Sequence, residues 1–414
     1  MKDQIIGYIN NPAELEKLYR SNKSLFRREF NTLYPEISGN PIAGFWNERL
    51  NYESNELNWV SGKDLLFVII AGLFAGILSK LQDILHIDEE LFYTRNIGFL
   101  IFPVLYIWFA WKNKMPVGKI VFLASMTVIG LLFINLLPND VWSDTLKLSC
   151  IHLPLFLWSL LGFAFVNGAG NNTEKRLGFL SYNGDLAVMT ALIAIAAGIV
   201  SAATVGLFSL IGLNIEQLYF RYVIQFAFPG APILANWLIQ ANPQLVGKVS
   251  PVIARIFSPL VLLMLVIYLV AIIYSGRSPY NDREFLIVFN VLLVGVMALI
   301  FFSVAESSRT YKHKAEIWIL TLLSIVTIII NGIALSAILY RIFEGGITPN
   351  RAAVLGGNVI ILANLLLVTV QLIRTLAKKN DISSVGHVIT RYLPVYLVWA
   401  AIVTFLFPFL FGFK

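Results

Sequence analysis

The chain has 414 residues, of which 57% are apolar and only 13% are charged. A soluble domain of this size could not expose so much apolar surface to water, so the composition excludes an ordinary soluble protein and predicts an integral membrane protein. The formal net charge of +7 does not call for nucleic acid as a partner, because basic residues collect in cytoplasmic loops and near anionic lipid head groups. The expected partner is the lipid bilayer.

Two domains are expected: a short, basic, amphipathic helical segment on the cytoplasmic side over residues 1–62, and a transmembrane domain over residues 63–414. The first long apolar run begins at Leu65, too far from Met1 for a cleavable signal peptide. The only cysteine, Cys150, lies in an apolar run and has no partner for an intrachain disulfide, so we interpret it as a packing residue.

The N-terminal segment has a helix-start signal at Asn11 and Pro12, followed by Glu14 and Glu16 in the first turn, where the helix dipole favours negative charge. Apolar and basic side chains then alternate at helical spacing: Leu15, Leu18, Tyr19, Phe26, Phe30 and Leu33 against Lys17, Arg20, Lys23, Arg27 and Arg28. This face either binds anionic lipid or an acidic partner, or it packs on the protein's own cytoplasmic face, which is the interpretation we favour. A second short helix is expected after Asn40 and Pro41, carrying Phe45, Trp46 and Leu50, and its aromatic side chains are expected at the membrane interface.

From Leu65 onward, apolar runs alternate with short polar loops, which predicts an all-α polytopic bundle of about ten transmembrane helices, with eleven as the alternative. Each predicted span is close to the length needed to cross the hydrocarbon layer. The predicted spans are 65–82, 97–112, 119–137, 148–167, 186–212, 256–275, 285–305, 316–341, 352–374 and 393–412.

The number of spans depends on the uncharged segment 222–237, which Pro229, Gly230 and Pro232 interrupt. It is an eleventh span, a broken helix or a re-entrant loop, and its prolines make it a candidate functional segment. The distribution of basic loops predicts a cytoplasmic N-terminus and mildly favours eleven spans, because only then do the loops around Lys312 and Lys378 lie inside. Hydropathy mildly favours ten.

Close packing is expected where small residues recur every four positions: Gly72 and Gly76 in the first span, and Gly198, Ala202 and Gly206 in the fifth. Polar side chains at membrane depth are further candidates for a functional path, although interhelical hydrogen bonding alone accounts for neutral amides. These polar residues are His152, Asn290, Asn331, Asn358, Asn364 and Gln371. The nearest ionisable groups, Lys80 and Glu306, lie near predicted helix ends, where they can reach the polar interface.

A candidate functional loop joins the predicted eighth and ninth spans. Thr348 can cap the helix that Pro349 opens, and glycines allow the turn before it. A helix N-terminus beside two arginines could also hold an anion or a lipid phosphate, with a glutamate pairing one arginine in the empty site. The candidate residues of this loop are Arg341, Glu344, Gly345, Gly346, Thr348, Asn350 and Arg351.

The string Gly346 to Arg351 and the small-residue helix that follows it, Ala352 to Asn358, resemble the bacterial family called domain of unknown function 4153. The resemblance covers the membrane domain, although only this loop is specific. It implies a multi-pass protein of the bacterial inner membrane with no established activity. Arg95-Asn96 and Arg255 to Pro259 are further candidate marks of the family.

No catalytic, metal-binding or cofactor-binding motif is present in the sequence, and we predict no cofactor. The leading hypothesis is a permease-like transporter of a small solute or lipid, with a central cavity near Pro229 to Pro232. The alternative is a non-transporting scaffold or sensor whose N-terminal segment contacts cytoplasmic partners or anionic lipid. A lipid-modifying enzyme ranks last. Substrate and oligomeric state stay open.

Overall fold

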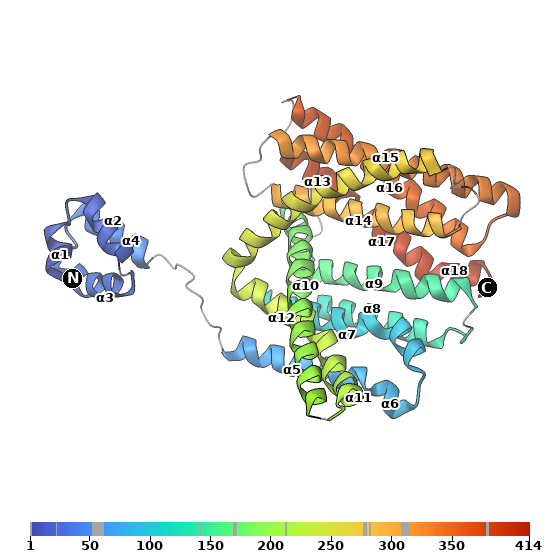
Figure 1. Ribbon diagram of the computed structural model, residues 1–414, viewed down its shortest axis with the longest axis horizontal. Coiled ribbons are helices and arrows are strands. Elements are labelled where there is room, and N and C mark those ends of the chain that lie inside the picture. Colours follow the sequence, from blue (N-terminus) through green and yellow to red (C-terminus); the bar gives the residue numbers. More distant parts are fainter. Residues whose placement is uncertain are drawn as a thin grey trace. The chain divides into compact units, whose positions relative to one another are not determined.

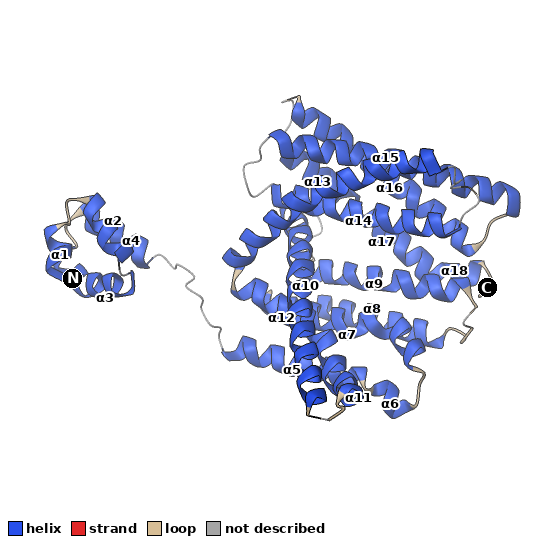
Figure 2. Ribbon diagram, in the orientation of Figure 1, coloured by secondary structure: helices blue, strands red, loops and turns tan. Residues whose placement is uncertain are grey.

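The structure, a computed structural model, describes residues 2–21, 23–51, 62–140, 142–168, 172–211, 213–275, 280, 283–307, 314–377 and 381–414. These residues form helices and connecting turns, and the described part of the chain contains no strand (Figure 1, Figure 2). The chain divides into two compact units, Met1–Val60 and Ser61–Lys414.

The N-terminal unit consists of α1 (Lys2–Gly7), α2 (Pro12–Ser21), α3 (Lys23–Ile37) and α4 (Pro41–Asn51). Helix α2 begins at Pro12, as the sequence predicts, and the Asn11 side chain accepts from the backbone N–H of Glu14 at 3.4 Å. The apolar face of these helices forms a core within the unit: Ile5, Leu15, Phe26, Phe30, Leu33, Ala43, Trp46 and Leu50. The amphipathic stripe is therefore used inside the unit itself, an arrangement that neither of the two interpretations had included.

Charged side chains support the outside of this small core. Glu16 pairs with Arg20 at 2.8 Å and with Arg49 at 2.9 Å, while Arg49 also stacks 4.6 Å above the Trp46 ring. The hydrogen bond from Arg20 holds the pKa of the Glu16 carboxyl below its ordinary value of 4.5. Trp46 is buried in this core, so the prediction that it lies at a membrane interface is wrong, whereas Phe45 is 64% exposed.

The membrane unit begins with α5 (Gly62–Ser79), α6 (Leu81–Leu85), α7 (Glu89–Lys112), α8 (Val117–Leu136), α9 (Asp144–Phe165) and the 38-residue α10 (Thr173–Leu210). Next come α11 (Glu216–Tyr219), the π-helical turn η1 (Phe220–Ile224) and α12 (Gln225–Ala241) as one continuous segment. The last third contains α13 (Pro243–Ser275), α14 (Arg283–Ser307), α15 (Lys314–Gly345), α16 (Pro349–Leu376), α17 (Ile382–Ala401), the π-turn η2 (Ile402–Leu406) and α18 (Phe407–Leu410).

Within the described residues, eleven helical segments are long and apolar enough to cross a membrane. The chain is therefore a multi-pass integral membrane protein with an all-α bundle, as predicted. The segment that a count of ten leaves out is Glu216–Ala241, where the prolines obscured the helix in the sequence. Lys312 and Lys378, on which the charge argument rested, lie outside the described residues.

Contacts between helix ends agree with an odd number of crossings. Lys112 at the end of α7 pairs with Asp64 at the start of α5, at 2.7 Å. At the other end of the bundle, the backbone N–H of Thr145 donates to the Lys414 carbonyl at 2.9 Å, which fixes the last residues beside the start of α9. The start of α5 and Lys414 thus lie at opposite ends.

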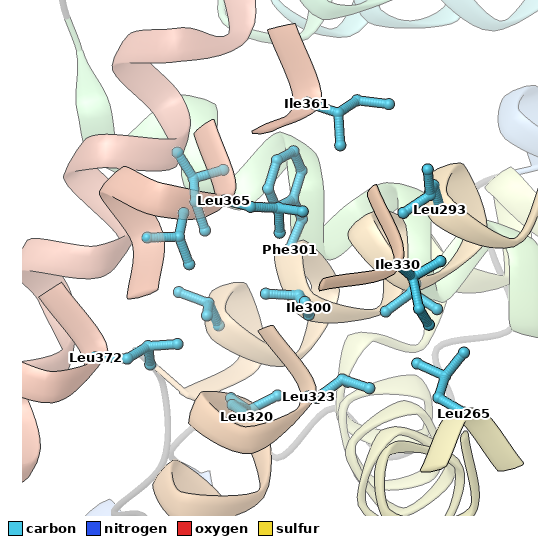
Figure 3. Packing of buried hydrophobic residues seen from close by; sticks show 14 of the residues in the cluster. Leu265, Leu293, Ile300, Phe301, Leu320, Leu323, Ile330, Ile361, Leu365 and Leu372 are labelled. Carbon is cyan, nitrogen blue, oxygen red and sulfur yellow. The ribbon is translucent and has the colours of Figure 1, made fainter. Parts of the chain in front are cut away.

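A large buried cluster of the described residues lies among α13 to α17, with a contribution from α10. Figure 3 shows buried side chains of this cluster in the space between the helices, including Leu293, Phe301, Ile330 and Leu365. Lipid is as apolar as these side chains, so close van der Waals packing rather than removal from water holds such helices together.

Three aromatic rings pack directly on helical glycines, so closely that a Cβ added to the glycine would overlap the ring. A Cβ added to Gly76 would lie 2.6 Å from Cγ of Phe226, and one added to Gly184 would lie 2.6 Å from Cγ of Phe302. At Gly356 it would lie 2.9 Å from Cζ3 of Trp399. The glycines therefore allow α5–α12, α10–α14 and α16–α17 to approach closely.

Of the four glycines predicted to touch other helices, only Gly76 does so. A Cβ added at Gly72, Gly198 or Gly206 would meet nothing within 4 Å, so the prediction that these glycines touch other helices is wrong. Gly198 and Gly206 lie in the C-terminal half of α10, where the apolar residues point outward.

Candidate functional site

The predicted loop between α15 and α16 is organised by local hydrogen bonds. The Thr348 hydroxyl accepts from the backbone N–H of Arg351 at 3.3 Å and so caps α16, and Gly346 has a φ of +75°, which suits glycine. Arg351 Nη1 donates to the Gly346 carbonyl at 2.7 Å. These contacts account for the cap and the turn.

The arginines and the glutamate of this loop are engaged separately. Arg341 Nε donates to the Tyr280 carbonyl at 3.0 Å, and the Tyr340 hydroxyl donates to Glu344. Among the described residues no ion pair joins Glu344 to Arg341 or Arg351. Asn350 lies in the first turn of α16 and Gly345 ends α15. An anion site here stays a prediction.

The predicted broken segment is a helix with a π-turn. Pro229 has no N–H to offer the carbonyl of Gln225 four residues earlier. The Ser79 hydroxyl from α5 donates to the Gly76 carbonyl at 2.6 Å and shares its hydrogen with the Gln225 carbonyl at 3.3 Å. Gly230 and Pro232 lie in the same helix, α12, and Pro232 is buried. The prolines therefore reshape the helix without ending it.

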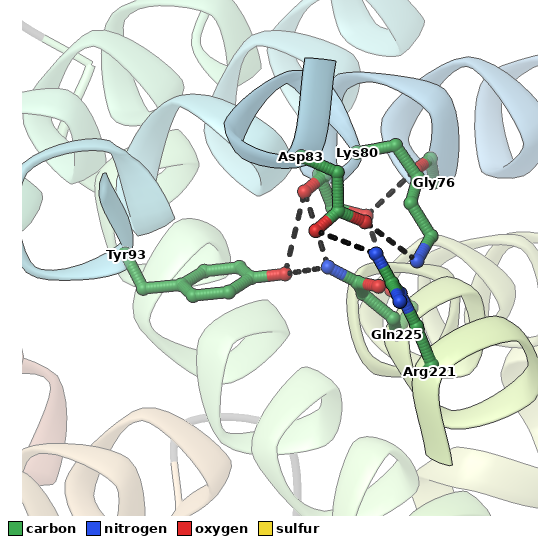
Figure 4. Close-up of polar contacts among 7 residues, drawn as sticks. Gly76, Lys80, Asp83, Tyr93, Arg221 and Gln225 are labelled. Atoms are coloured by element: carbon green, nitrogen blue, oxygen red, sulfur yellow. Dashed lines mark hydrogen bonds and ion pairs between the residues drawn. The ribbon is translucent and has the colours of Figure 1, made fainter. Parts of the chain in front are cut away.

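Figure 4 shows the polar cluster that holds this turn against the end of α5. Gln225 Nε2 donates to the Tyr93 hydroxyl at 2.7 Å and to the Ser79 carbonyl at 3.2 Å. Asp83 pairs with Lys80 at 3.1 Å and with Arg221 at 3.4 Å. Each charge of the cluster thus has an opposite partner, and the arrangement is that of a structural junction between α5, α6, α7 and η1.

A separate feature with the properties of a ligand site is a chamber of about 750 Å³ between α9 and α10 on one side and α13, α14, α16 and α17 on the other. Its described lining contains no Asp, Glu, Lys or Arg. Leu155, Phe257 and Val294 line it and are about half exposed (51%, 52% and 52%), so the chamber is only partly enclosed. All three lie inside predicted spans, away from the helix ends.

Few polar atoms face this chamber, and most of them are already bonded. Trp158 Nε1 donates to Asn183 Oδ1 at 2.8 Å. The Tyr396 hydroxyl accepts from Asn364 at 2.9 Å and donates to Met297 Sδ at 3.1 Å. These bonds join α9 to α10 and α14 and α16 to α17, so the polar lining fixes the walls of the chamber.

Two polar lining residues have an atom left over: Trp399, whose Nε1 is buried and forms no hydrogen bond with the described residues, and His152. In His152, Nδ1 lies 2.9 Å from the Leu148 carbonyl of the same helix. A carbonyl only accepts, so Nδ1 carries the hydrogen and, in the neutral ring, Nε2 is an acceptor. Within the described residues no hydrogen bond to Nε2 is formed.

Beside the chamber, sharing Ala254 with it, lies a polar cavity of about 40 Å³, large enough for one water molecule. Arg255 and Glu316 pair across it at 3.0 Å, and the Ser181 hydroxyl donates to Glu306. Glu306 is only 6% exposed. Although Glu306 lies near the end of α14, its side chain is therefore enclosed by protein.

Of the polar residues that the sequence singled out, only His152 lines the chamber, and Asn364 supports it through Tyr396. The other amides connect helices elsewhere: Asn358 Nδ2 donates to Asn290 Oδ1 at 2.9 Å, and Asn331 donates to the Asn358 carbonyl at 3.1 Å. Pro229, Gly230 and Pro232 are not part of the chamber lining, so the cavity does not lie where the permease hypothesis placed it.

Sequence reasoning missed several lining residues, above all Trp158, Asn183 and Tyr396. In the sequence they look like ordinary interfacial or packing residues, and no spacing signal connects them. In the described residues no group of three or more His, Cys, Asp or Glu side chains is arranged to hold a metal ion. No protein-family model, curated protein or solved structure matches this chain.

Proposed function

We propose that this protein is a permease-like carrier of an apolar or amphiphilic small molecule, lipids included. The chamber of about 750 Å³ is the observation that supports it, because its volume falls in the range of small-molecule sites. An uncharged, mainly apolar lining favours a ligand that partitions into hydrocarbon over an ion or a sugar. The half-exposed lining residues Leu155, Phe257 and Val294 offer a route of entry from the bilayer.

Occupancy of the chamber is tested with a brominated long-chain alkane, whose bromines quench nearby tryptophans. Trp158 and Trp399 line the chamber, so we expect saturable quenching in the full-length protein. Ala187→Phe fills the chamber and should weaken the quenching, whereas Ala191→Phe, one turn along α10 and outside the lining, should leave it unchanged. Equal quenching in both variants would remove the basis of the proposal.

Transport requires that a ligand change the access to the chamber. Single cysteines placed at Leu155 and Phe257 in a Cys150→Ala background should change their labelling rate when the alkane is added to protein in sealed vesicles. Rates that stay the same at both positions would leave a binding protein and exclude a permease.

A second candidate is a scaffold or sensor, which is favoured by one observation: residues 1–60 form a compact unit with its own core. Over these residues seven basic and eight acidic side chains nearly balance, so general attraction to anionic lipid is weak and a protein partner is the better proposal. Deleting residues 2–58 should then abolish the cellular phenotype while the membrane unit stays folded. Retained function would exclude this role.

The proposed location is the bacterial inner membrane, with the end where α5 begins facing the cytoplasm. The charge distribution supports this orientation, because Lys112 and Lys119 lie at that end while Asp83 and Asp140 lie at the other. Membership of the domain of unknown function 4153 family is likewise a proposal and rests on the Gly346–Arg351 string. Reporter fusions to Lys414 test the orientation, since a cytoplasmic C-terminus would contradict it.

A further inference from the structure

The chamber has a chemical preference that its apolar character alone does not specify. The following argument rests on the proposed function, because it assumes that the chamber takes a ligand. Its described lining offers no charged side chain, and a charged group at membrane depth without a partner is costly. The ligand that fits is therefore uncharged.

The hydrogen bonds of the lining residues restrict the class of ligand further. The indole of Trp158 and the hydroxyl of Tyr396 already donate to Asn183 Oδ1 and Met297 Sδ. Because Nδ1 of His152 is turned to the backbone of α9, Nε2 on the opposite edge of the ring is directed away from that backbone. His152 lies in the middle part of the span Asp144–Phe165, at the level of the chamber. The unbonded Nε1 of Trp399 adds one donor to this acceptor. A ligand group that both donates and accepts therefore suits the lining best.

We propose that the chamber binds a neutral amphiphile with a single hydroxyl group on a long apolar chain, and that this hydroxyl donates to Nε2 of His152. A long-chain alcohol has this chemistry. The apolar chain lies against the aliphatic and aromatic lining, and the hydroxyl hydrogen satisfies the imidazole nitrogen. An alkane leaves this acceptor unbonded, an ether offers no donor, and a carboxylate brings a charge and no donor.

The test uses four ligands with the same 16-carbon chain, each displacing the brominated alkane from the full-length wild-type protein. They are hexadecanol, hexadecane, hexadecyl methyl ether and palmitate at a pH where it is ionised. We expect hexadecanol to bind roughly tenfold more tightly than the alkane and the ether, as the loss of one buried hydrogen bond implies. Palmitate should bind most weakly.

Variants then assign the preference to His152. His152→Leu should remove the advantage of hexadecanol while leaving hexadecane binding unchanged, and His152→Gln, whose amide oxygen accepts, should restore part of it. The wild-type protein gives an independent readout even if these variants do not fold. Its four histidines can be ¹⁵N-labelled, and one Nε2 signal should shift with hexadecanol but not with hexadecane.

The outcomes separate this inference from the proposed function. If hexadecanol, the ether and hexadecane bind equally, recognition of the hydroxyl is overturned while chamber binding stands. If palmitate binds most tightly, a charged head group is accepted and the inference is wrong. If none of the four displaces the brominated alkane, and the alkane itself does not bind saturably, the proposed function fails together with the inference.

Discussion

Replacing Gly184 with alanine tests whether the close packing of the Phe302 ring on Gly184 of α10 holds α14 in place. The added Cβ would lie 2.6 Å from Cγ of Phe302 and closer still to the ring edge. Because Cγ does not move when the ring flips, Phe302 must change its χ1 rotamer or α14 must shift. Overpacking of this kind costs about 1–3 kcal/mol, which is offset by a gain of roughly 0.5–1 kcal/mol from the higher helix propensity of alanine.

The expected net loss for Gly184→Ala is therefore between about 0 and 2.5 kcal/mol of unfolding free energy. Gly295→Ala in α14 is the matched control, because a Cβ there meets nothing within 4 Å, and it should be neutral or slightly stabilising. Both variants are measured by denaturant unfolding in mixed micelles. In a Phe302→Leu background the cost of Gly184→Ala should fall, which gives a coupling energy from the double-mutant cycle. Equal stability of Gly184→Ala and Gly295→Ala in the wild-type background would refute the reasoning.

Three further variants each remove the hydrogen bonds of one polar side chain. Arg95→Gln should lower the unfolding free energy by about 2–3 kcal/mol, because this buried guanidinium donates to the carbonyls of residues 135, 137 and 138 at the end of α8; the same change at exposed Arg374 should have no effect. Ser79→Ala should cost about 1 kcal/mol in the same unfolding assay and speed hydrogen exchange around residues 225–229, and unchanged exchange would contradict the role given to its hydroxyl. The Arg20 hydrogen bond lowers the pKa of Glu16 in the folded state. The ionised Glu16 carboxyl therefore stabilises the fold fully above pH 4.5, and this stabilisation is lost as the pH falls through the lowered pKa. Glu16→Gln should remove this part of the acid dependence of hydrogen exchange in α2.

The spans themselves could be read from the sequence because length and hydropathy are local properties. The sixth candidate span could not be read in this way, because Pro229 and Pro232 are ordinarily helix breakers. One contact at this position comes from a serine 146 residues away: the Ser79 hydroxyl, bonded to the Gly76 carbonyl at 2.6 Å, lies 3.3 Å from the carbonyl that Pro229 leaves open. A partner at such a distance leaves no trace in the local pattern.

The chamber could not be predicted for a similar reason. Its polar lining residues Trp158, Asn183 and Tyr396 come from three helices, and their meeting depends on how α9 and α10 pack against α13 to α17. The sequence pointed instead to amides such as Asn331 and Asn358, which are buried and bonded between neighbouring helices. Polarity at membrane depth therefore identified helix contacts better than it identified the cavity.

The π-turns η1 and η2 also determine how this chain should compare with relatives. In each turn the backbone bonds to the fifth residue back instead of the fourth, so each holds one residue more than an α-helical path would need. One residue corresponds to about 100° of rotation in an α-helix. A homologue that lacks one of these turns should therefore align with a single-residue gap at that turn, within 220–224 for η1 or within 402–406 for η2. Only a deletion there keeps the inward faces of the helix in phase before and after the turn. A gap at any other place in these helices would turn one half of the helix toward lipid.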